Sequence, residues 1–346
     1  MSKKLANDKC PSCGGTFVFN PKNQNLICKK CGSEVEIEFS KNVLKHDISE
    51  IRNSKLDQIW NKNNVVLKCN ACGAKMLDNA NTYSTTCPYC GSTNVVNHSE
   101  MVGLKPDSII PFQFNETQAI QIFKENLKSK FFLPSKLKKV QFKPDVRSLY
   151  VPSFTFDAIT TTEYSGWVYK WIESKEHGRQ KKSYHISGTI SINHTDVIVE
   201  VSDHIDSSQL NSILPFYLNK AVAFNEDFVR GFPLEQFNTL VDTAYNNAKN
   251  EINRSIKNAI ISKHNADGDD NLTIKTIYSN EKYAYRVIPI YFMDYLYNKN
   301  KYSTIMNGQT GKVGKGFPRS LGKILTAVLV PLGIIIAGIV TLCSII

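Results

Sequence analysis

Eight cysteines in the first 90 residues form two sets with identical spacing, and this repeat constrains the fold more than any other feature. Each set contains two Cys-x-x-Cys-Gly turns, with fourteen residues between the inner cysteines. All four cysteines of the first set recur 59 positions later, an offset that chance would not produce. The two sets are Cys10, Cys13, Cys28 and Cys31, and Cys69, Cys72, Cys87 and Cys90.

Four thiolates in this arrangement match the tetrahedral shell of structural zinc. Each set therefore predicts one Zn²⁺ ion, two in all, held in zinc ribbons at 8–33 and 67–93. A complete four-thiolate shell leaves no open position for a catalytic water, so both sites are predicted to be structural. A redox Cys-x-x-Cys would be a single motif beside a βαβ pattern, whereas this chain has two matched pairs. The glycine after each turn favours the left-handed backbone that points amides back toward sulfur.

Residues 34–66 join the two ribbons and predict a linker with a short helix. Asp47 and Glu50 resemble a capping box. An amphipathic run follows the box, and its apolar members are Ile48, Ile51, Leu56, Ile59 and Trp60.

Residues 104–318 predict an α+β domain with a largely antiparallel sheet. Asn115 is placed to cap a helix that runs to about Lys130, with Ile120, Phe123 and Leu127 as its apolar stripe. A second helix is expected from Glu235 to about His264. Strands are expected in 148–171, 185–203, 271–279, 283–298 and 301–307, which are rich in β-branched and aromatic residues.

No motif in this region indicates catalysis, and the chain is predicted not to be an enzyme. Gly308 and Gly311 are too close together for a phosphate-binding loop, and Val313 stands where that loop needs a hydroxyl. The histidines are scattered, and the sequence contains no HExxH pattern or nucleophile elbow.

The C-terminal segment 324–346 has 23 residues and no charge. As a helix it would be about 35 Å long, enough for a hydrocarbon layer of about 30 Å. Lys312, Lys315, Arg319 and Lys323 precede it and no charge follows it. The pattern predicts a tail-anchored, single-pass protein of the cell membrane, with the bulk of the chain cytoplasmic. The predicted fold class is thus multidomain: two zinc ribbons, an α+β domain and one transmembrane helix.

Several motifs outside the ribbons carry a resemblance to a known family. They are "DSIIPFQF" (107–114), "YVPSFTFDA" (150–158), "FVRGFPLEQF" (228–237), "VIPIYFMDYLY" (287–297) and "NGQTGKVGKGFP" (307–318). With the cysteine turns, they resemble bacterial membrane-anchored proteins labelled TFIIB-type zinc ribbon-containing proteins. Some relatives have an aromatic run where this chain has Pro152-Ser153-Phe154, and some are labelled as replication-restart helicases, whose motifs are absent here.

The resemblance implies a scaffold at the cytoplasmic membrane, with flotillin-like or phage-shock-like proteins as partners. We therefore expect an adaptor whose two ribbons form separate, metal-set docking surfaces for protein partners. The alternative is a membrane-tethered nucleic-acid-binding protein, and the sequence argues against it. The formal net charge of +11 falls to about +7 once eight thiolates and two zinc ions are counted. The ribbon hairpins offer few cations, Lys22 beside Phe17 and Phe19 in the first and Lys75 in the second.

Overall fold

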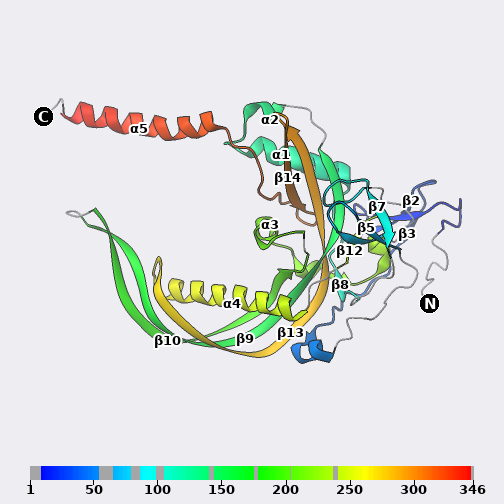
Figure 1. Ribbon diagram of the computed structural model, residues 1–346, viewed down its shortest axis with the longest axis horizontal. Coiled ribbons are helices and arrows are strands. Elements are labelled where there is room, and N and C mark those ends of the chain that lie inside the picture. Colours follow the sequence, from blue (N-terminus) through cyan, green and yellow to red (C-terminus); the bar gives the residue numbers. More distant parts are fainter. Residues whose placement is uncertain are drawn as a thin grey trace.

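The computed structural model describes residues 9–53, 65–78, 86–98, 105–139, 144–174, 178–202, 204–236 and 241–343. Within these residues the strands form two sheets, a small one in the N-terminal ribbon and a large mixed one (Figure 1). The small sheet has the order β1-β2-β3, from β1 (Phe17–Asn20), β2 (Asn25–Cys28) and β3 (Glu34–Glu36).

The large sheet has eleven strands, and most neighbouring pairs are antiparallel. Its main path is β11-β8-β13-β9-β12-β6-β5-β7, with β10 beside β9 and with β14 and β4 beside β13. Its strands are β4 (His46–Asp47), β5 (Val65–Cys69), β6 (Lys75–Asp78), β7 (Val95–His98), β8 (Ser108–Ile109), β9 (Asp145–Ser174), β10 (Gly178–Glu200), β11 (Val222–Ala223), β12 (Leu234–Glu235), β13 (Gly268–Tyr297) and β14 (Asn300–Asn307).

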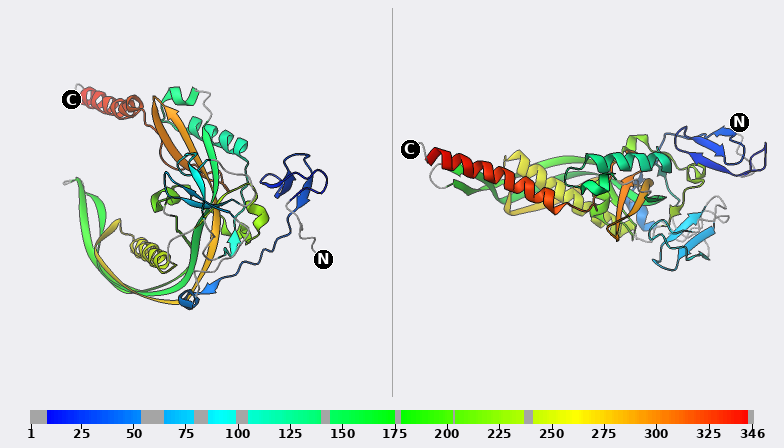
Figure 2. Two further views of the ribbon diagram at one scale, coloured as in Figure 1. Left: turned by 45° about the vertical axis from the view of Figure 1, so that its right-hand side comes forward. Right: turned by 90° about the horizontal axis from the view of Figure 1, so that it is seen from above.

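Most helices lie beside this sheet, whereas the C-terminal helix extends away from the body (Figure 1). The helices are α1 (Glu116–Ser129), α2 (Ser135–Lys139), α3 (Ser207–Ile213), α4 (Val241–Lys263) and α5 (Leu321–Cys343), with short 3₁₀ turns η1 (Ile48–Asn53), η2 (Leu218–Lys220) and η3 (Glu226–Val229). Ribbon 1 and the far end of α5 lie at opposite ends of the molecule (Figure 2).

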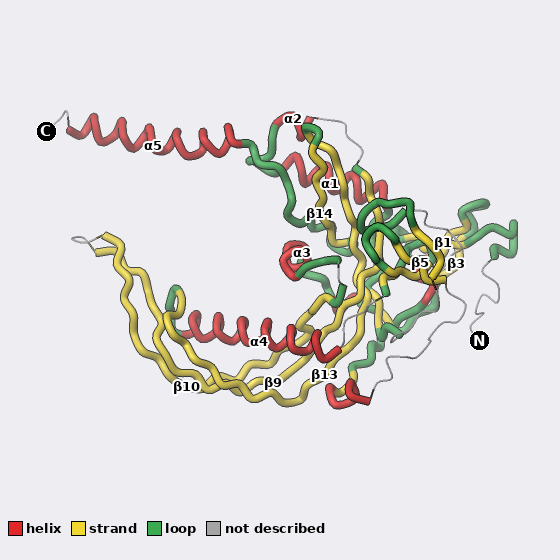
Figure 3. Tube along the Cα trace, in the orientation of Figure 1, coloured by secondary structure: helices red, strands yellow, loops and turns green. Residues whose placement is uncertain are grey.

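Three long strands, β10, β9 and β13, continue beyond the body as a curved arm that wraps around α4 (Figure 3). Ile252, Ile256 and Ile260 recur every four residues on α4 and are buried against the strand residues Val168 and Ile186. This spacing places the three isoleucines on one helix face. The arm therefore has its own small core beneath α4.

Two irregularities bend the strands where the arm leaves the body. The register of β10 shifts between His194 and Val197, and that of β13 shifts between Ser279 and Lys282. Both shifts contain a residue with positive φ, Asp196 at 53° and Asn280 at 51°. They flank the same stretch of β9, and an extra residue in a strand increases its local bend.

Helix α1 confirms the predicted cap and most of the predicted stripe. Asn115 accepts a hydrogen bond from the Gln118 backbone, and the Gln118 side chain accepts one from the Asn115 backbone, which completes a capping box. Phe123 and Leu127 are buried, with Ala119 in place of the expected Ile120. The second predicted helix is shorter than expected, because α4 begins at Val241 and residue 235 belongs to β12.

The predicted α+β class is wrong, because the structure is mostly β with a mixed sheet. Segments 271–279 and 283–298, expected as separate strands, form the single strand β13. Two pairings in the sheet are parallel, β8 with β13 and β12 with β9. In the linker, the predicted helix is the 3₁₀ turn η1, and Leu56, Ile59 and Trp60 lie outside the described residues.

The predicted transmembrane helix at 324–346 is also corrected. Among the residues that the structure describes, no helix is long and apolar enough to cross a membrane. The helix in this region, α5, includes Lys323, and residues 344–346 fall outside the described part. The tail anchor and the single-pass membrane localisation expected from the sequence are therefore not supported.

Candidate metal centres

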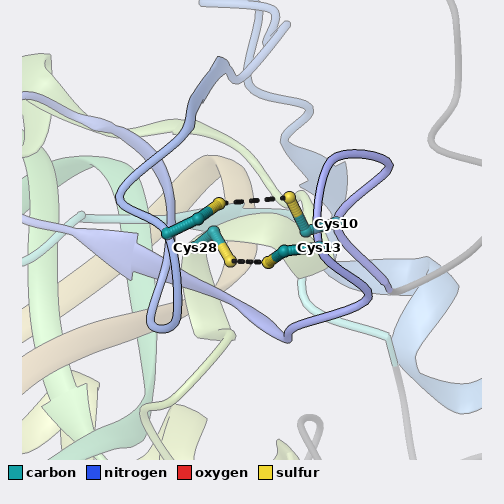
Figure 4. Close-up of side chains that lie close together, drawn as sticks. Cys10, Cys13 and Cys28 are labelled. Carbon is teal, nitrogen blue, oxygen red and sulfur yellow. Dashed lines mark hydrogen bonds between the residues drawn. The ribbon is translucent and has the colours of Figure 1, made fainter.

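The structure brings each predicted cysteine set together into one group. Within each set, all four Sγ atoms lie within 4.8 Å of one another. The shortest contacts follow the same pattern in both: Cys10–Cys31 and Cys13–Cys28 at 3.6 and 3.5 Å, Cys69–Cys90 and Cys72–Cys87 at 3.6 Å each. Figure 4 shows Cys13 pointing toward Cys28 from the facing turn.

These distances fit zinc and exclude disulfides. A disulfide would bring two sulfur atoms to about 2.05 Å. Four sulfurs at about 2.3 Å from a central zinc lie about 3.8 Å apart at the corners of a tetrahedron. The observed contacts of 3.5–3.6 Å are close to that edge. Each four-cysteine group could therefore bind one zinc ion.

The four turns share one backbone hydrogen-bond pattern, which explains the glycine in each. The glycine N–H donates to the carbonyl of the turn's first cysteine at 2.8–2.9 Å. That cysteine's own N–H donates to the carbonyl five residues later, at 2.7–2.9 Å. The four glycines have φ between +69° and +82°, which confirms the predicted left-handed backbone. They are Gly14, Gly32, Gly73 and Gly91.

The thiols differ in how readily they ionise. Hydrogen bonds from the Ser33 hydroxyl and backbone lower the pKa of Cys31 to about 6. Burial raises the pKa of Cys87 well above its ordinary value. Zinc binding requires the thiolate form, so binding at ribbon 2 must displace the proton of Cys87.

Ribbon 1 is packed on the body rather than held away from it. The ring of Phe19 lies edge-on to Phe228 and Phe232, with centroids 5.2 and 6.0 Å apart. The Phe19 N–H donates to the Arg230 carbonyl at 2.9 Å. The side chain of Gln24 donates to the Phe112 carbonyl at 2.8 Å. The ribbon core and the body core form one apolar cluster.

Ribbon 2 joins the body through main-chain pairing. Its strand β6 pairs with β12, and β12 pairs in turn with β9 at Tyr150. The cysteine turn carries Tyr89, whose ring lies edge-on to Phe292 at 4.9 Å. Arg147 Nη1 donates to the Cys87 carbonyl at 3.3 Å, and Nη2 pairs with the buried Asp294. The metal group of ribbon 2 thus sits directly on the central sheet.

Sequence reasoning missed these attachment residues. Arg147 and Cys87 are 60 positions apart, and Tyr89 and Ser202 are 113 apart. Periodicity within a strand says nothing about such partners. The one local signal was Tyr89, an aromatic residue inside a cysteine turn, where a small polar residue would be enough for a turn.

Comparisons with known proteins support the zinc-ribbon assignment. A family model described as TFIIB zinc-binding matches residues 9–42, which contain the first four-cysteine group. The chain is 23% identical over 330 residues to the Bacillus subtilis (strain 168) protein named "Uncharacterized protein YdjG", and the match covers 91% of each chain. No solved structure matches. These findings do not extend to the membrane anchoring or to the full family label that the resemblance implied. Residues 9–42 are therefore similar to a TFIIB-type zinc ribbon, and Cys69–Cys90 hold a second four-cysteine group of the same geometry.

Proposed function

We propose that the chain is a zinc-stabilised scaffold that binds other proteins and has no catalytic activity of its own. The observation that carries this proposal is the attachment of both ribbons to the body, by packing in ribbon 1 and by strand pairing in ribbon 2. Phe17 and Phe19 of ribbon 1 are only 1% and 3% exposed. In this arrangement, zinc fixes the shape of the protein surface around the ribbons.

The burial of ribbon 1 also argues against the nucleic-acid alternative. A ribbon that binds single strands needs exposed aromatic rings for base stacking and cations for phosphates. In ribbon 1 the rings of Phe17 and Phe19 face the protein interior. Tyr83, the aromatic residue of the second hairpin, lies outside the described residues.

The arm supplies a surface suited to protein partners. Trp167 and Trp171 are 48% and 40% exposed, and they alternate with Val168, which is buried beneath α4. Successive side chains of a strand point to opposite faces, so both tryptophans lie on the face away from α4. Arg179 lies over the Trp171 ring, 4.8 Å from its centroid. Tryptophan and arginine are enriched among residues that dominate protein interfaces.

The proposal is tested by crosslinking in cells that express the full chain, followed by mass spectrometry. The double substitution Trp167→Ser and Trp171→Ser is expected to remove partners that the unchanged protein retains. Tyr217→Ser is the matched control, because Tyr217 is 57% exposed on the body rather than the arm. Flotillin-like and phage-shock-like partners, implied by the family resemblance, remain a prediction that this experiment also examines.

The rival function has its own measurement. Fluorescence anisotropy with labelled DNA and RNA oligonucleotides should show no submicromolar binding at about 150 mM salt, where exposed charges are screened beyond about 8 Å. Tight binding of a defined oligonucleotide under these conditions would replace the scaffold proposal with the nucleic-acid one.

A further inference from the structure

A cavity of about 390 Å³ opens where the turn after α1 meets the segment that leads into α5. Residues 130–133 form one wall and residues 314–319 the other. The Ser320 N–H donates to the Phe132 carbonyl at 2.8 Å, and Lys323 Nζ donates to the Leu133 carbonyl at 2.8 Å. The two walls, nearly 200 positions apart in the chain, are therefore fixed to each other.

The charged side chains of this cavity are all cationic. Lys130, Lys315 and Arg319 line it, and no acidic residue does. Among the described residues none of the three forms an ion pair, whereas Lys45, Lys181 and Arg286 each pair with an aspartate. The sequence has no Asp or Glu from 126 to 144 or from 295 to 346. The two segments that carry these cations thus supply no carboxylate of their own.

Partial burial makes the charged form of one of these cations, Lys130, less favourable. Desolvation lowers the pKa of Lys130, whose ammonium lies 4.5 Å from the centre of the Phe317 ring. A positive group withdrawn from water without a carboxylate partner is stabilised when an anion binds beside it. The cavity therefore holds positive charge that no carboxylate in its lining balances.

The remaining wall is apolar. Phe131 and Phe132 are 66% and 46% exposed, with their rings edge-to-face at 5.2 Å. Phe317 and Pro318 continue the apolar surface on the other side. Exposed phenylalanines beside a cationic cavity suit a ligand with one anionic end and one apolar end.

We infer that this cavity binds an organic phosphate whose apolar group lies against Phe131 and Phe132. Three cations match the double negative charge of a phosphate monoester better than the single charge of a carboxylate. The guanidinium of Arg319 can also bind two phosphate oxygens at once. This binding is separate from the proposed scaffold function and does not depend on zinc or on the arm.

The test is calorimetry on the full chain with four soluble probes: inorganic phosphate, phenyl phosphate, hexyl phosphate and adenosine monophosphate. Phenyl or hexyl phosphate should bind about tenfold more tightly than inorganic phosphate, because the apolar group adds buried area. Hexyl phosphate as the best probe would indicate a lipid-type phosphate, and adenosine monophosphate as the best would indicate a nucleotide.

Variants separate the two halves of the site. Lys315→Ser and Arg319→Ser should each weaken the binding of all four probes about tenfold. Both side chains are exposed, so the substitutions should leave the fold intact. Phe131→Ser should weaken the binding of hexyl phosphate and leave the binding of inorganic phosphate unchanged.

The matched control is Lys41→Ser, because Lys41 is an exposed lysine outside the cavity. Equal weakening by Lys41→Ser, or no detectable binding of hexyl phosphate to the folded protein, would overturn the inference. Tighter binding of a 20-nucleotide single strand than of any small probe would likewise overturn it, in favour of a nucleic-acid surface.

Discussion

Gly166 marks the closest approach of two strands in the arm. Its φ is +151°, and a Cβ built there would lie 1.9 Å from the Asn271 carbonyl oxygen. The register of β13 shifts opposite this region, between Asp269 and Asn271. The residue between them, Asp270, pairs with Lys181 on β10 and accepts a hydrogen bond from Ser183. Only a residue without a side chain therefore fits at position 166 against β13.

Gly166→Ala is therefore expected to lower the free energy of unfolding by about 2–4 kcal/mol, from backbone strain and overpacking combined. Gly178→Ala is the control, because its φ is +66° but no atom lies within 4 Å of the added Cβ. It should cost about 1 kcal/mol, from backbone strain alone. Urea unfolding followed by circular dichroism measures both, and equal losses would show that the close contact has no effect.

His46 connects the linker between the ribbons to the body. Partial burial lowers its pKa, but the Asp107 carboxylate, 2.7 Å from Nε2, and Glu50, 3.3 Å from Nδ1, outweigh burial and raise it. A raised pKa in the folded state stabilises the protein below the ordinary histidine pKa of about 6.5. The stabilisation is lost as pH rises through the folded-state value.

The stability difference between the unchanged protein and His46→Gln should consequently be larger at pH 6 than at pH 8. Urea unfolding at a series of pH values measures it, and a nuclear magnetic resonance titration of His46 gives the pKa directly. A difference that does not change with pH would mean that the pKa of His46 is the same in the folded and the unfolded protein. His185, which is exposed and forms no ion pair within the described residues, offers the control substitution His185→Gln.

At the scale of elements, the two ribbons differ in how they attach. Ribbon 1 packs its aromatic side chains on η3 and adds no strand to the large sheet. Ribbon 2 contributes β5, β6 and β7 to the large sheet itself. Loss of metal from ribbon 2 should therefore disturb backbone pairing in the body, whereas loss from ribbon 1 should mainly expose side chains.

Cys28→Ser and Cys87→Ser test this difference as a matched pair. Elemental analysis should find one zinc ion in each variant and two in the unchanged protein. Hydrogen exchange should speed up in β6 and β12 for Cys87→Ser only, because Leu77 pairs with Leu234 across them. Faster exchange in β12 for both variants would show that metal loss from either ribbon disturbs the large sheet.

The sequence could predict those elements whose signals are local. The cysteine spacing predicted both four-cysteine groups, and Asn115 predicted the start of α1, because the atoms involved lie within a few residues or repeat at a fixed offset. Long-range pairing could not be predicted: Leu234 meets Tyr150 and Leu77 from distant positions. The α+β expectation failed for the same reason, since nothing in 268–297 shows that two short apolar stretches form one strand.

At the scale of the whole molecule, one apolar cluster unites ribbon 1, α1, α4, β9 and β13. Phe17, Phe19 and Leu26 from the ribbon are each at most 3% exposed within it. Burial of three such side chains contributes about 6 kcal/mol. A ribbon of this size holds its shape only with its metal. We therefore expect bound zinc to stabilise the body as well as the ribbons. The sequence alone predicted two ribbons that act as separate docking surfaces.

Removing zinc with a chelator should accordingly lower the unfolding midpoint of the body by about 10 °C, given about 2 °C for each kcal/mol in a chain of this size. Differential scanning calorimetry measures the midpoint. Tryptophan fluorescence of a Trp60→Phe variant, which keeps only Trp167 and Trp171, reports on the arm separately. Added zinc should restore the midpoint, and the double variant Cys28→Ser, Cys87→Ser should unfold at the lower temperature with or without chelator. If the body transition stayed in place after both ions were removed, the ribbons would be independent units. The large sheet alone would then stabilise the surface of the scaffold, because the stability of the body would not depend on the metal.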